Sequence, residues 1–574
     1  MASEFGSQSK EFGERSHSSD SLSEGPGLPP QALWNSSALW SETPFENAFF
    51  DLNSSWFLGG TAESPRTWKS SAPDHLSPSS TEIQTTAPPI SGWIPSVPTS
   101  SMGSSDFVRD HHLAHAYVGG SMANGIASVD LVEALSRDGS LGFYGAAGQT
   151  PDKVAQALSE LQSRCPDKPW GCNLIHSPSE PTIENEVSRL ISTREIRHVE
   201  ASAYLDISEP LIRLRLQGLE KGPGGEVRAK TSIMAKASRL EVARKFLSPA
   251  PEPIVRKLLA SGEITAEQSQ WAKEWPLCDD LTAEADSGGH TDNRPLTTLV
   301  PAFCKLRDTL AGNLHRTAKV RIGAAGGLGT PDAIAAAFAL GAGYVVVGSV
   351  HQACSESGSS PKVRDLLATA GPADVIMAPA SDMFEMGVHL QVLRRGTMFG
   401  PRARRLLELY RAYDAIDEIP ANDRQRIENE IFRMPLEEVW SHTRNFFLER
   451  EPSQIERAEQ DSHHRMALIF RWYLGKSSDW ANSGDPQRAL DYQIWCGPAM
   501  GAFNEWTRGT TLEFPAGRGV ARVSRALMAG AALCLRAHDL QRQGFQIPVN
   551  GWRMPQIQSS GNSDHQIQHL RSTL

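Results

Sequence analysis

A glycine-rich segment in the second half of this 574-residue chain has the residue types of a phosphate-binding turn. It reads GAAGGLGTPD over 323–332 and ends where Thr330 can cap a helix whose first residue is Pro331. Glycine lets the backbone approach a ligand closely, and a helix N-terminus presents unpaired N–H groups to an anion. The segment therefore predicts a phosphate site, and a tight strand–helix turn without a ligand is the structural alternative.

A second turn lies about twenty residues further along the chain. The apolar run 344–347 ends at Gly348 and Ser349. In eightfold barrels the loops after the seventh and eighth strands hold a phosphate together. We predict that both turns contribute to one site, with these residues: Ala325, Gly326, Gly327, Gly348 and Ser349.

The segment EADSGGHTD (284–292) carries the best candidate for proton transfer. His290 follows two glycines at the end of a predicted strand, and an imidazole with an ordinary pKa near 6.5 can donate or accept a proton. An exposed or capping histidine is the alternative. We expect the residues before it to contact the same ligand: Ser287, Gly288 and Gly289.

Two further turns suggest a flat ligand. The segment GGSMANG (119–125) is small enough to leave room for a ring, and Asn173, on a predicted strand, offers an amide to a polar ring edge. Each pattern also occurs in turns without ligands. The predicted contact residues are Gly120, Ser121, Met122, Ala123 and Asn173.

The elements that would position these residues alternate between short apolar runs and amphipathic helices. We predict strands over 114–119, 142–145, 171–175, 198–202, 229–234, 280–284, 320–324 and 344–348. Eight strand–helix units favour an α/β fold, a closed (β/α)8 TIM barrel. An open doubly wound sheet is the alternative, but it would place a G-x-G-x-x-G turn after the first strand, and none is there.

The rest of the chain divides by composition. The first hundred residues hold 22 serines and 11 prolines, so we predict a disordered tail over 1–45 and, because tryptophans interrupt the polar sequence, an irregular arm over 46–105 that docks on the body. The barrel is expected over 106–375 with a helical insertion at 238–277. A C-terminal helical subdomain is expected over 376–574.

Composition also excludes several classes of protein. The net charge of −10 disfavours nucleic acid as a partner, and no apolar run reaches the roughly 20 residues that a membrane helix needs. No signal peptide is evident, and seven scattered cysteines without a CxxC pair fit a reduced, cytoplasmic chain without a zinc site.

The order of these motifs resembles FMN-dependent nitronate monooxygenase and enoyl-reductase barrels. More narrowly, the chain resembles the PfaD-type trans-acting enoyl reductases of polyunsaturated fatty-acid and polyketide synthases. The segments that carry the resemblance are MANGIAS (122–128), NLIHSP (173–178), VEASAYL (199–205), EADSGGHTDNRP (284–295), AAGGLGTP (324–331), DMFEMGVHLQVLRRGTMF (382–399) and DYQIWCGPAMGAFNEW (491–506).

The resemblance implies that NADPH and FMN deliver a hydride to an enoyl thioester on an acyl carrier protein. It places the family histidine at His290, as thioester-orienting group or proton relay, and Lys236 near the flavin ring, although a solvated lysine is an equal alternative. A nitronate monooxygenase-like oxidase and a non-catalytic docking subunit remain alternative functions.

Two further groups of residues have both structural and functional interpretations. An arginine cluster (Arg394, Arg395, Arg402, Arg404 and Arg405) either docks the acidic carrier protein or forms a solvated helix face. Trp495 and Trp506 are expected in the core of the helical subdomain rather than in a substrate wall, and Cys496 is expected to be buried and inert.

Overall fold

The computed structural model describes residues 39–61, 64–71, 83–84, 90–178, 180–289, 292–545 and 547. Most of the tail expected over 1–45 lies outside these residues. The described chain forms two compact units. The first comprises the residues up to Ser96 together with His538–Ile547, and the second comprises Val97–Ala537.

The first unit is a five-stranded antiparallel sheet with strand order β4-β1-β3-β2-β5. Phe57 and Trp68 face each other across β2 and β3 and form a buried pair. This sheet differs from the irregular arm expected over 46–105, and its first strand, Leu39–Thr43, lies within the tail expected to be disordered. The serine-rich sequence between the strands hid their pattern. Its elements are β1 Leu39–Thr43, α1 Phe45–Phe50, β2 Trp56–Thr61, β3 Ser64–Ser71, β4 Ile83–Gln84 and β5 Ile90–Ile94.

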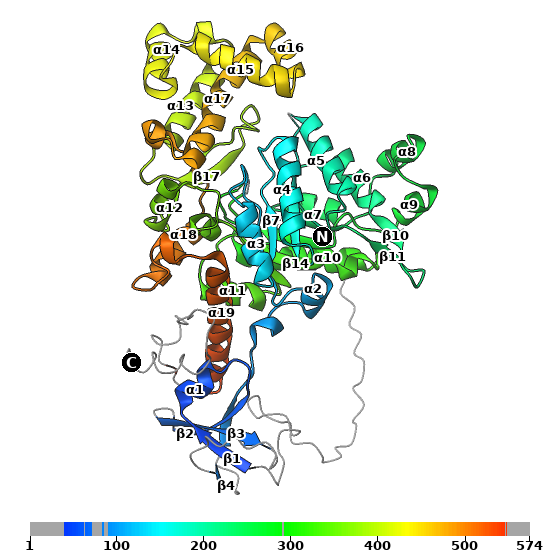
Figure 1. Ribbon diagram of the computed structural model, residues 1–574, viewed down its shortest axis with the longest axis vertical. Helices are drawn as coiled ribbons and strands as arrows, with labels where there is room; N and C mark the ends of the chain where they lie inside the picture. Colours follow the sequence, from blue (N-terminus) through cyan, green and yellow to red (C-terminus); the bar gives the residue numbers. More distant parts are fainter. Residues whose placement is uncertain are drawn as a thin grey trace, which may run out of the picture. The chain divides into compact units, whose positions relative to one another are not determined.

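The second unit contains a closed parallel barrel of eight strands, which confirms the predicted TIM barrel (Figure 1). Its strands are β6 Tyr117–Gly119, β7 Leu141–Tyr144, β8 Trp170–Ile175, β9 His198–Ser202, β12 Ser232–Ala237, β13 Asp280–Glu284, β14 Arg321–Ala325 and β15 Tyr344–Val347. A short hairpin of β10 Leu219–Lys221 and β11 Val227–Ala229 precedes β12.

Helices follow the strands around the barrel. They are α2 Ser105–Asp110, α3 Val129–Arg137, α4 Pro151–Arg164, α5 Pro181–Thr193, α6 Glu209–Gln217, α7 Leu240–Phe246, α10 Leu296–Ala311, α11 Pro331–Ala339 and α12 Pro361–Ala368. The expected insertion supplies α8 Glu252–Ala260 and α9 Ala266–Trp271. Single 3-10 turns are η3 Thr99–Ser101, η4 Thr317–Lys319 and η5 Ser349–Ala353.

Alternate residues along β13 lie at three successive levels of the barrel. Asp280 lies at the amino end of the strand, Thr282 in the middle, where its hydroxyl is 2.8 Å from that of Tyr344, and Glu284 at the carboxyl end, where it lines a cavity. One strand therefore supplies a polar group to each end of the barrel and one to its centre.

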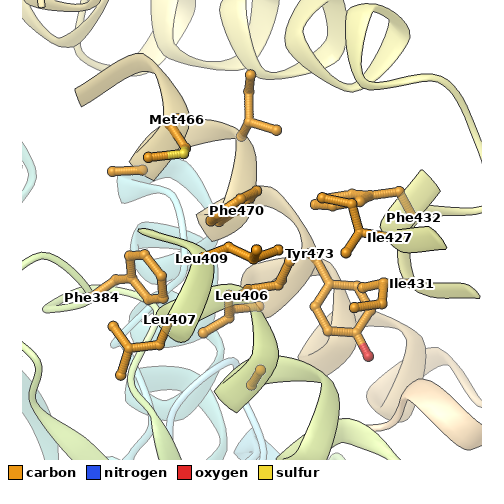
Figure 2. Packing of buried hydrophobic residues seen from close by; sticks show 14 of the residues in the cluster. Phe384, Leu406, Leu407, Leu409, Ile427, Ile431, Phe432, Met466, Phe470 and Tyr473 are labelled. Atoms are coloured by element: carbon orange, nitrogen blue, oxygen red, sulfur yellow. The ribbon is translucent and has the colours of Figure 1, made fainter. Parts of the chain in front are cut away.

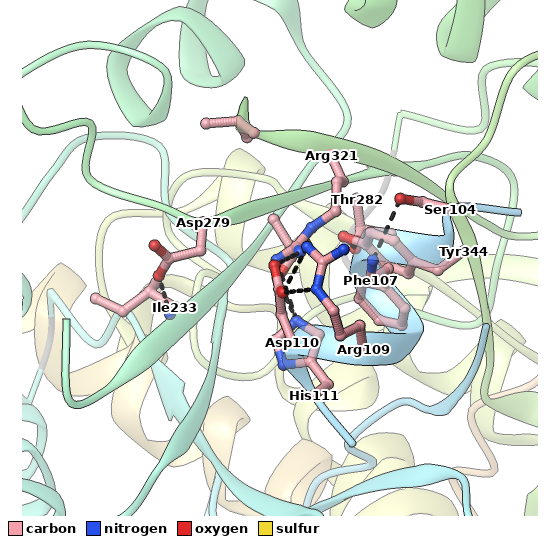
Figure 3. A network of polar contacts seen from close by, with 12 residues as sticks. Ser104, Phe107, Arg109, Asp110, His111, Ile233, Asp279, Thr282, Arg321 and Tyr344 are labelled. Atoms are coloured by element: carbon pink, nitrogen blue, oxygen red, sulfur yellow. Dashed lines mark hydrogen bonds and ion pairs between the residues drawn. The ribbon is translucent and has the colours of Figure 1, made fainter. Parts of the chain in front are cut away.

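The amino end of the barrel is closed by α2. Ser104 caps this helix, and Phe107 stacks on the Tyr344 ring at 4.3 Å. Arg321 Nε donates to Asp280 at 2.6 Å, and His111 Nε2 lies 2.8 Å from the other carboxylate oxygen of Asp280. Figure 3 shows Arg321 and His111 close to each other in this network. Although burial opposes ionisation, His111 and Arg321 hold the pKa of Asp280 below its usual range.

The helical region beyond the barrel has its own apolar core, in which Phe432, Phe470 and Tyr473 pack together (Figure 2). It begins with an antiparallel hairpin of β16 Val375–Pro379 and β17 His389–Leu393. Its helices are α13 Phe399–Ala412, α14 Ala421–Ile427, α15 Leu436–Arg450, α16 Ser453–Gln460, α17 Ser462–Ser483, α18 Pro498–Thr507 and α19 Val520–Arg542, with a π turn at η7 Glu428–Phe432 and 3-10 turns at η6 Ile416–Glu418, η8 Pro486–Asp491 and η9 Pro515–Gly517.

The arginine cluster does not form one continuous surface. Arg402 forms a buried ion pair with Asp491, which also accepts from the Tyr473 hydroxyl at 2.9 Å, and Arg405 pairs with Asp423 at 2.6 Å. Arg402 therefore stabilises the interior of the helical region and is not part of an exposed surface, because a fully buried carboxylate is costly without a cation beside it.

Within the described part of the chain, no helix is long and apolar enough to cross a bilayer. The same residues contain no group of three or more histidine, cysteine or acidic side chains arranged to hold a metal ion.

Candidate active site

A cavity opens at the carboxyl ends of the barrel strands and brings together all fourteen residues that the sequence predicts to contact a cofactor. It encloses about 1180 Å³, including its open mouth. The residues are Gly120, Ser121, Met122, Ala123, Asn173, Lys236, Ser287, Gly288, Gly289, Ala325, Gly326, Gly327, Gly348 and Ser349. They come from six different strand–helix loops or strand ends, as in other barrels of this architecture.

The loop after β14 requires glycine at two consecutive positions. Gly326 and Gly327 have φ values of +91° and +73°, and a Cβ on Gly326 would lie 2.6 Å from the carbonyl carbon of Ala285. No atom of the described residues lies within 4 Å of a Cβ built on Gly327, so this backbone faces open space in the described structure. Thr330 caps α11 with its side chain, as predicted.

Lys236, on β12, lies between two carboxylates at the base of the cavity. Its Nζ is 3.3 Å from Glu284 Oε1 and 3.8 Å from Glu200 Oε2, and its side chain is 12% exposed. Burial alone would lower the pKa of Lys236, but the two carboxylates raise it above its ordinary value. The structure thus holds a permanent cation at the cavity and excludes the solvated-lysine alternative.

Glu200 is a residue that sequence reasoning missed. It is fully buried on β9, and its Oε2 accepts from the Ser121 N–H at 3.0 Å and from the Ser121 hydroxyl. Burial raises its pKa, against the opposing effects of Lys236 and Ser121. Among the described residues, Oε1 has no hydrogen-bond partner. The signal in the sequence that could have revealed Glu200 is a charged residue in the middle of an apolar strand.

Asn173 is tied to the neighbouring strand by its amide nitrogen. Nδ2 donates to the Glu200 carbonyl at 2.9 Å and to the Ser202 hydroxyl at 2.8 Å. Because both amide hydrogens are used in this way, the side-chain carbonyl oxygen is the group that can accept from a ligand.

His290 and Thr291 lie outside the described residues, but the loop that contains them is fixed on both sides. Asp286 accepts from the Asn293 side chain at 2.7 Å and from the Gln391 side chain at 2.8 Å. Gln391 belongs to β17, so a strand outside the barrel holds the base of the histidine loop.

The segment before α18 forms a further wall and corrects one expectation. Trp495 lines the cavity together with Leu390 and Ala499, although its ring also packs against the helical core. A Cβ on Gly288 would lie 2.8 Å from the Cys496 nitrogen, so the two backbones are in direct contact. The expectation that Trp495 packs against the helical core is met, but Trp495 is also part of the cavity wall.

Cys496 itself is buried, as expected. Burial raises the pKa of its thiol to about 12, so the group is neutral at physiological pH and is not a nucleophile. Trp506 packs edge to face against Phe503 within the helical region.

The cavity suits an anionic, flat ligand on the evidence of its own residues. Glycine backbones with open space in front of them form one side, and a buried ammonium group and small side chains form the other. Such a donor set can bind a phosphate at one end and a polar ring at the other. We therefore regard this cavity as the candidate active site.

Two family models match the chain. Residues 105–210 match nitronate monooxygenase, and residues 413–492 match the inserted helical domain of [acyl-carrier-protein] S-malonyltransferase. The first match covers part of the barrel and the second covers helices α14 to α17 of the C-terminal region.

The curated relatives come from fatty-acid and polyketide biosynthesis. The chain is 42% identical over 454 residues to a polyunsaturated fatty acid synthase subunit of Thraustochytrium sp., covering 77% of this chain and 30% of that protein. It is 40% identical over 451 residues to the polyketide biosynthesis protein PksE of Bacillus subtilis, covering 78% of this chain and 58% of PksE. The chain thus spans less than two thirds of the length of these relatives.

One solved structure resembles this chain over the whole of its own length. The enoyl reductase domain of MlnA, from the macrolactin biosynthesis cluster of Bacillus amyloliquefaciens, superposes with a TM-score of 0.73 at 35% identity. The match covers 78% of this chain and 100% of that domain. Together with the barrel and the ordered motifs, these similarities show that the chain belongs to the family of PfaD-type enoyl reductases.

Proposed function

We propose that the protein is a trans-acting enoyl reductase that reduces the 2,3 double bond of enoyl thioesters on acyl carrier protein during polyketide or polyunsaturated fatty-acid biosynthesis. The observation that carries the proposal is one cavity that is lined both by two glycine loops and by the buried Lys236. The full-length match to an enoyl reductase domain supports the reaction type.

The cofactor that fits this cavity best is FMN. When bound, it supplies hydride transfer between NADPH and a conjugated double bond. Gly326, Gly327, Gly348 and Ser349 would hold its phosphate through backbone N–H groups. Lys236 would place its positive charge beside the ring and favour electron density there.

The overall reaction balances as NADPH, a proton and an enoyl thioester giving NADP⁺ and a saturated thioester. A C–H bond of the NADPH nicotinamide breaks and its hydride ends on Cβ, the π electrons form a bond from Cα to the incoming proton, and the bond between that proton and its donor breaks. We assign His290 to orient the thioester or to relay that proton. Its neighbours support this role, since Gly289 lines the candidate active site and Asp292 lines an adjoining cavity.

Acyl carrier protein is the proposed partner. The match of 413–492 to a helical domain of a carrier-protein malonyltransferase supports it. Three arginines of the cluster, Arg394, Arg395 and Arg404, remain exposed and could steer an acidic carrier toward the enzyme.

An anaerobic assay tests the reaction directly. The purified protein is incubated with NADPH and crotonyl thioester, free and carrier-bound, and we expect NADPH oxidation and a product two hydrogens heavier by mass spectrometry. His290→Ala should retain its flavin absorbance but reduce the thioester at least 100-fold more slowly, because loss of a general acid typically costs this much. Full activity in His290→Ala would remove the histidine from the mechanism.

The match to nitronate monooxygenase over 105–210 supports a second candidate, a flavin oxidase that takes electrons from a nitronate. Nitronate-dependent oxygen uptake without thioester-dependent NADPH oxidation would favour it. A purified protein without flavin absorbance would instead favour a non-catalytic docking subunit.

A further inference from the structure

A second cavity adjoins the candidate active site and has no assigned role. It encloses about 890 Å³, including its mouth, and lies between the loop after β9, the start of α7 and the connection from β16 to β17. Ala203, Lys236 and Glu284 line both cavities and therefore form a neck between them.

The neck is held in a specific backbone conformation. Ala203 has a φ of +60°, in the left-handed region that non-glycine residues rarely adopt. Strain of this kind persists where the surrounding structure requires it and is concentrated at functional sites. The small Ala203 side chain keeps the passage between the two cavities open where a longer one would narrow it.

Part of the outer wall of the second cavity is apolar. Two of its residues are large hydrophobic side chains that remain exposed, Met386 at 57% and Leu205 at 46%. Met383, Val388 and Val242 continue the same surface inward. Methionine side chains adapt their shape to varied apolar ligands, and exposed apolar surface of this kind marks binding grooves.

The polar groups of this cavity already bond to protein partners. Arg239 donates to both oxygens of Asp292 at 2.7 Å, and Ser238 donates to the same carboxylate at 2.9 Å. The Tyr204 hydroxyl donates to Glu184 at 3.1 Å, and His389 Nδ1 lies 2.8 Å from the Gly387 carbonyl oxygen. An amide-rich ligand would have to break these bonds, whereas a hydrocarbon would leave them intact.

We propose that the second cavity binds the distal acyl chain of the substrate. The proposal rests on the proposed enoyl reductase function. The reacting carbons would lie on the active-site side of the neck, and the chain beyond them would run past Val242 and Val388 toward Met386. The connection between β16 and β17, which lies outside the barrel, would then determine which chain lengths are reduced efficiently.

The test compares Met386→Trp and Met386→Glu with Met398→Trp and Met398→Glu. Met398 is a matched control, because it is an exposed methionine at 44% that lines neither cavity. The substrates are 2-enoyl thioesters of N-acetylcysteamine with four, eight and twelve carbons, which avoid any effect on carrier docking. The readout is kcat/KM for each chain length, with flavin content checked by absorbance.

We expect both Met386 variants to lower the ratio of kcat/KM for twelve carbons to that for four carbons at least fivefold. Both Met398 variants should leave this ratio within twofold of wild type. An equal loss at all chain lengths, or no change in the ratio, would overturn the proposal. The four-carbon substrate is also assayed as its pantetheine thioester, and a loss seen only with that substrate would assign the cavity to the pantetheine arm and would also overturn the proposal.

The same experiment separates this proposal from the function on which it rests. If the wild-type protein reduces no enoyl thioester, including the four-carbon one, the proposed function itself fails. If wild type reduces every chain length and the Met386 variants do not change the ratio, only the acyl-chain site fails.

Discussion

Each end of the barrel buries a carboxylate beside a cation. At the amino end Asp280 pairs with Arg321 at 2.6 Å, and nearer the carboxyl end Glu200 lies 3.8 Å from Lys236. Both carboxylates are fully buried. Yet the pKa of Asp280 is lowered and that of Glu200 is raised.

The difference lies in the neighbouring groups. His111 and Arg321 lower the pKa of Asp280 electrostatically and through hydrogen bonds, whereas at Glu200 Lys236 and Ser121 act against burial, and the Glu284 carboxylate raises the pKa further. Both Asp280 oxygens accept from charged or aromatic donors on Arg321 and His111, whereas in the described chain Glu200 Oε1 has none. Burial alone therefore does not decide the charge of an interior carboxylate. The hydrogen-bond network of Asp280 is thus saturated, whereas that of Glu200, behind the residues that line the cavity, is not.

Breaking the saturated network should have the largest effect. Arg321→Met leaves Asp280 buried with His111 alone, so we expect the free energy of unfolding to fall by about 3–5 kcal/mol. Urea denaturation measures it. A loss below about 1 kcal/mol would show that the amino end is not stabilised by this ion pair, and flavin content should be unchanged in the folded fraction.

The glycine loop at the open end should affect binding rather than stability. Gly327→Asp points a carboxylate toward the proposed phosphate, and we expect flavin affinity to fall about 100-fold, or roughly 2.7 kcal/mol. Gly262→Asp is the matched control, since Gly262 has nearly the same φ of +72° and open space around its Cβ. Equal flavin content in both variants would place the phosphate elsewhere.

Removing the cation of the open end should reduce turnover without unfolding the protein. We expect Lys236→Met to lower kcat for crotonyl thioester about 30-fold, roughly 2 kcal/mol, because a preorganised charge beside the reacting ring is lost. Lys245→Met, which removes an exposed lysine paired with Asp206, is the control. Steady-state kinetics with wild-type activity in Lys236→Met would leave the lysine with a structural role only.

The smallest expected effect is a pH dependence of the free energy of unfolding, caused by His198 near the amino end of the barrel. Burial, and after it His111, lowers the pKa of His198 to about 3, so the folded state stays neutral while the unfolded histidine binds a proton below pH 6.5. Stability is thus present above pH 6.5 and is lost as pH falls, by about 1.4 kcal/mol at pH 5.5. His198→Gln should remove this part of the pH dependence in denaturation curves. If the slope of stability against pH is the same in His198→Gln as in wild type, the assignment to His198 is contradicted.

The sequence predicted the barrel because its signals are local. The strands at 198–202 and 280–284 were placed to the residue, whereas the strand expected at 229–234 begins at Ser232. The hairpin of β10 and β11 accounts for the difference, since Ala229, where the expected strand began, is the last residue of β11.

The residues of the candidate site could be predicted where glycine or histidine marks a loop. They could not be predicted where their role depends on how the barrel closes and which distant segments pack against it. The fourteen predicted contact residues meet in one cavity because the ends of parallel strands share one face. Glu200 was missed because its contacts with Lys236 and Ser121 form only after the strands close. The place of Trp495 in the cavity wall was missed because it depends on a distant segment packing back on the barrel.

The contact between Gly288 and the backbone of Cys496 limits how this enzyme can be recombined. Two loops about two hundred residues apart in the sequence are in direct backbone contact here. A side chain at Gly288 would collide with the other loop unless that loop moved. A chimera that exchanges only the barrel between relatives would combine two backbones that have not been matched at this contact. An exchange intended to transfer chain-length preference should therefore include the barrel and the chain that follows it as far as Ala499.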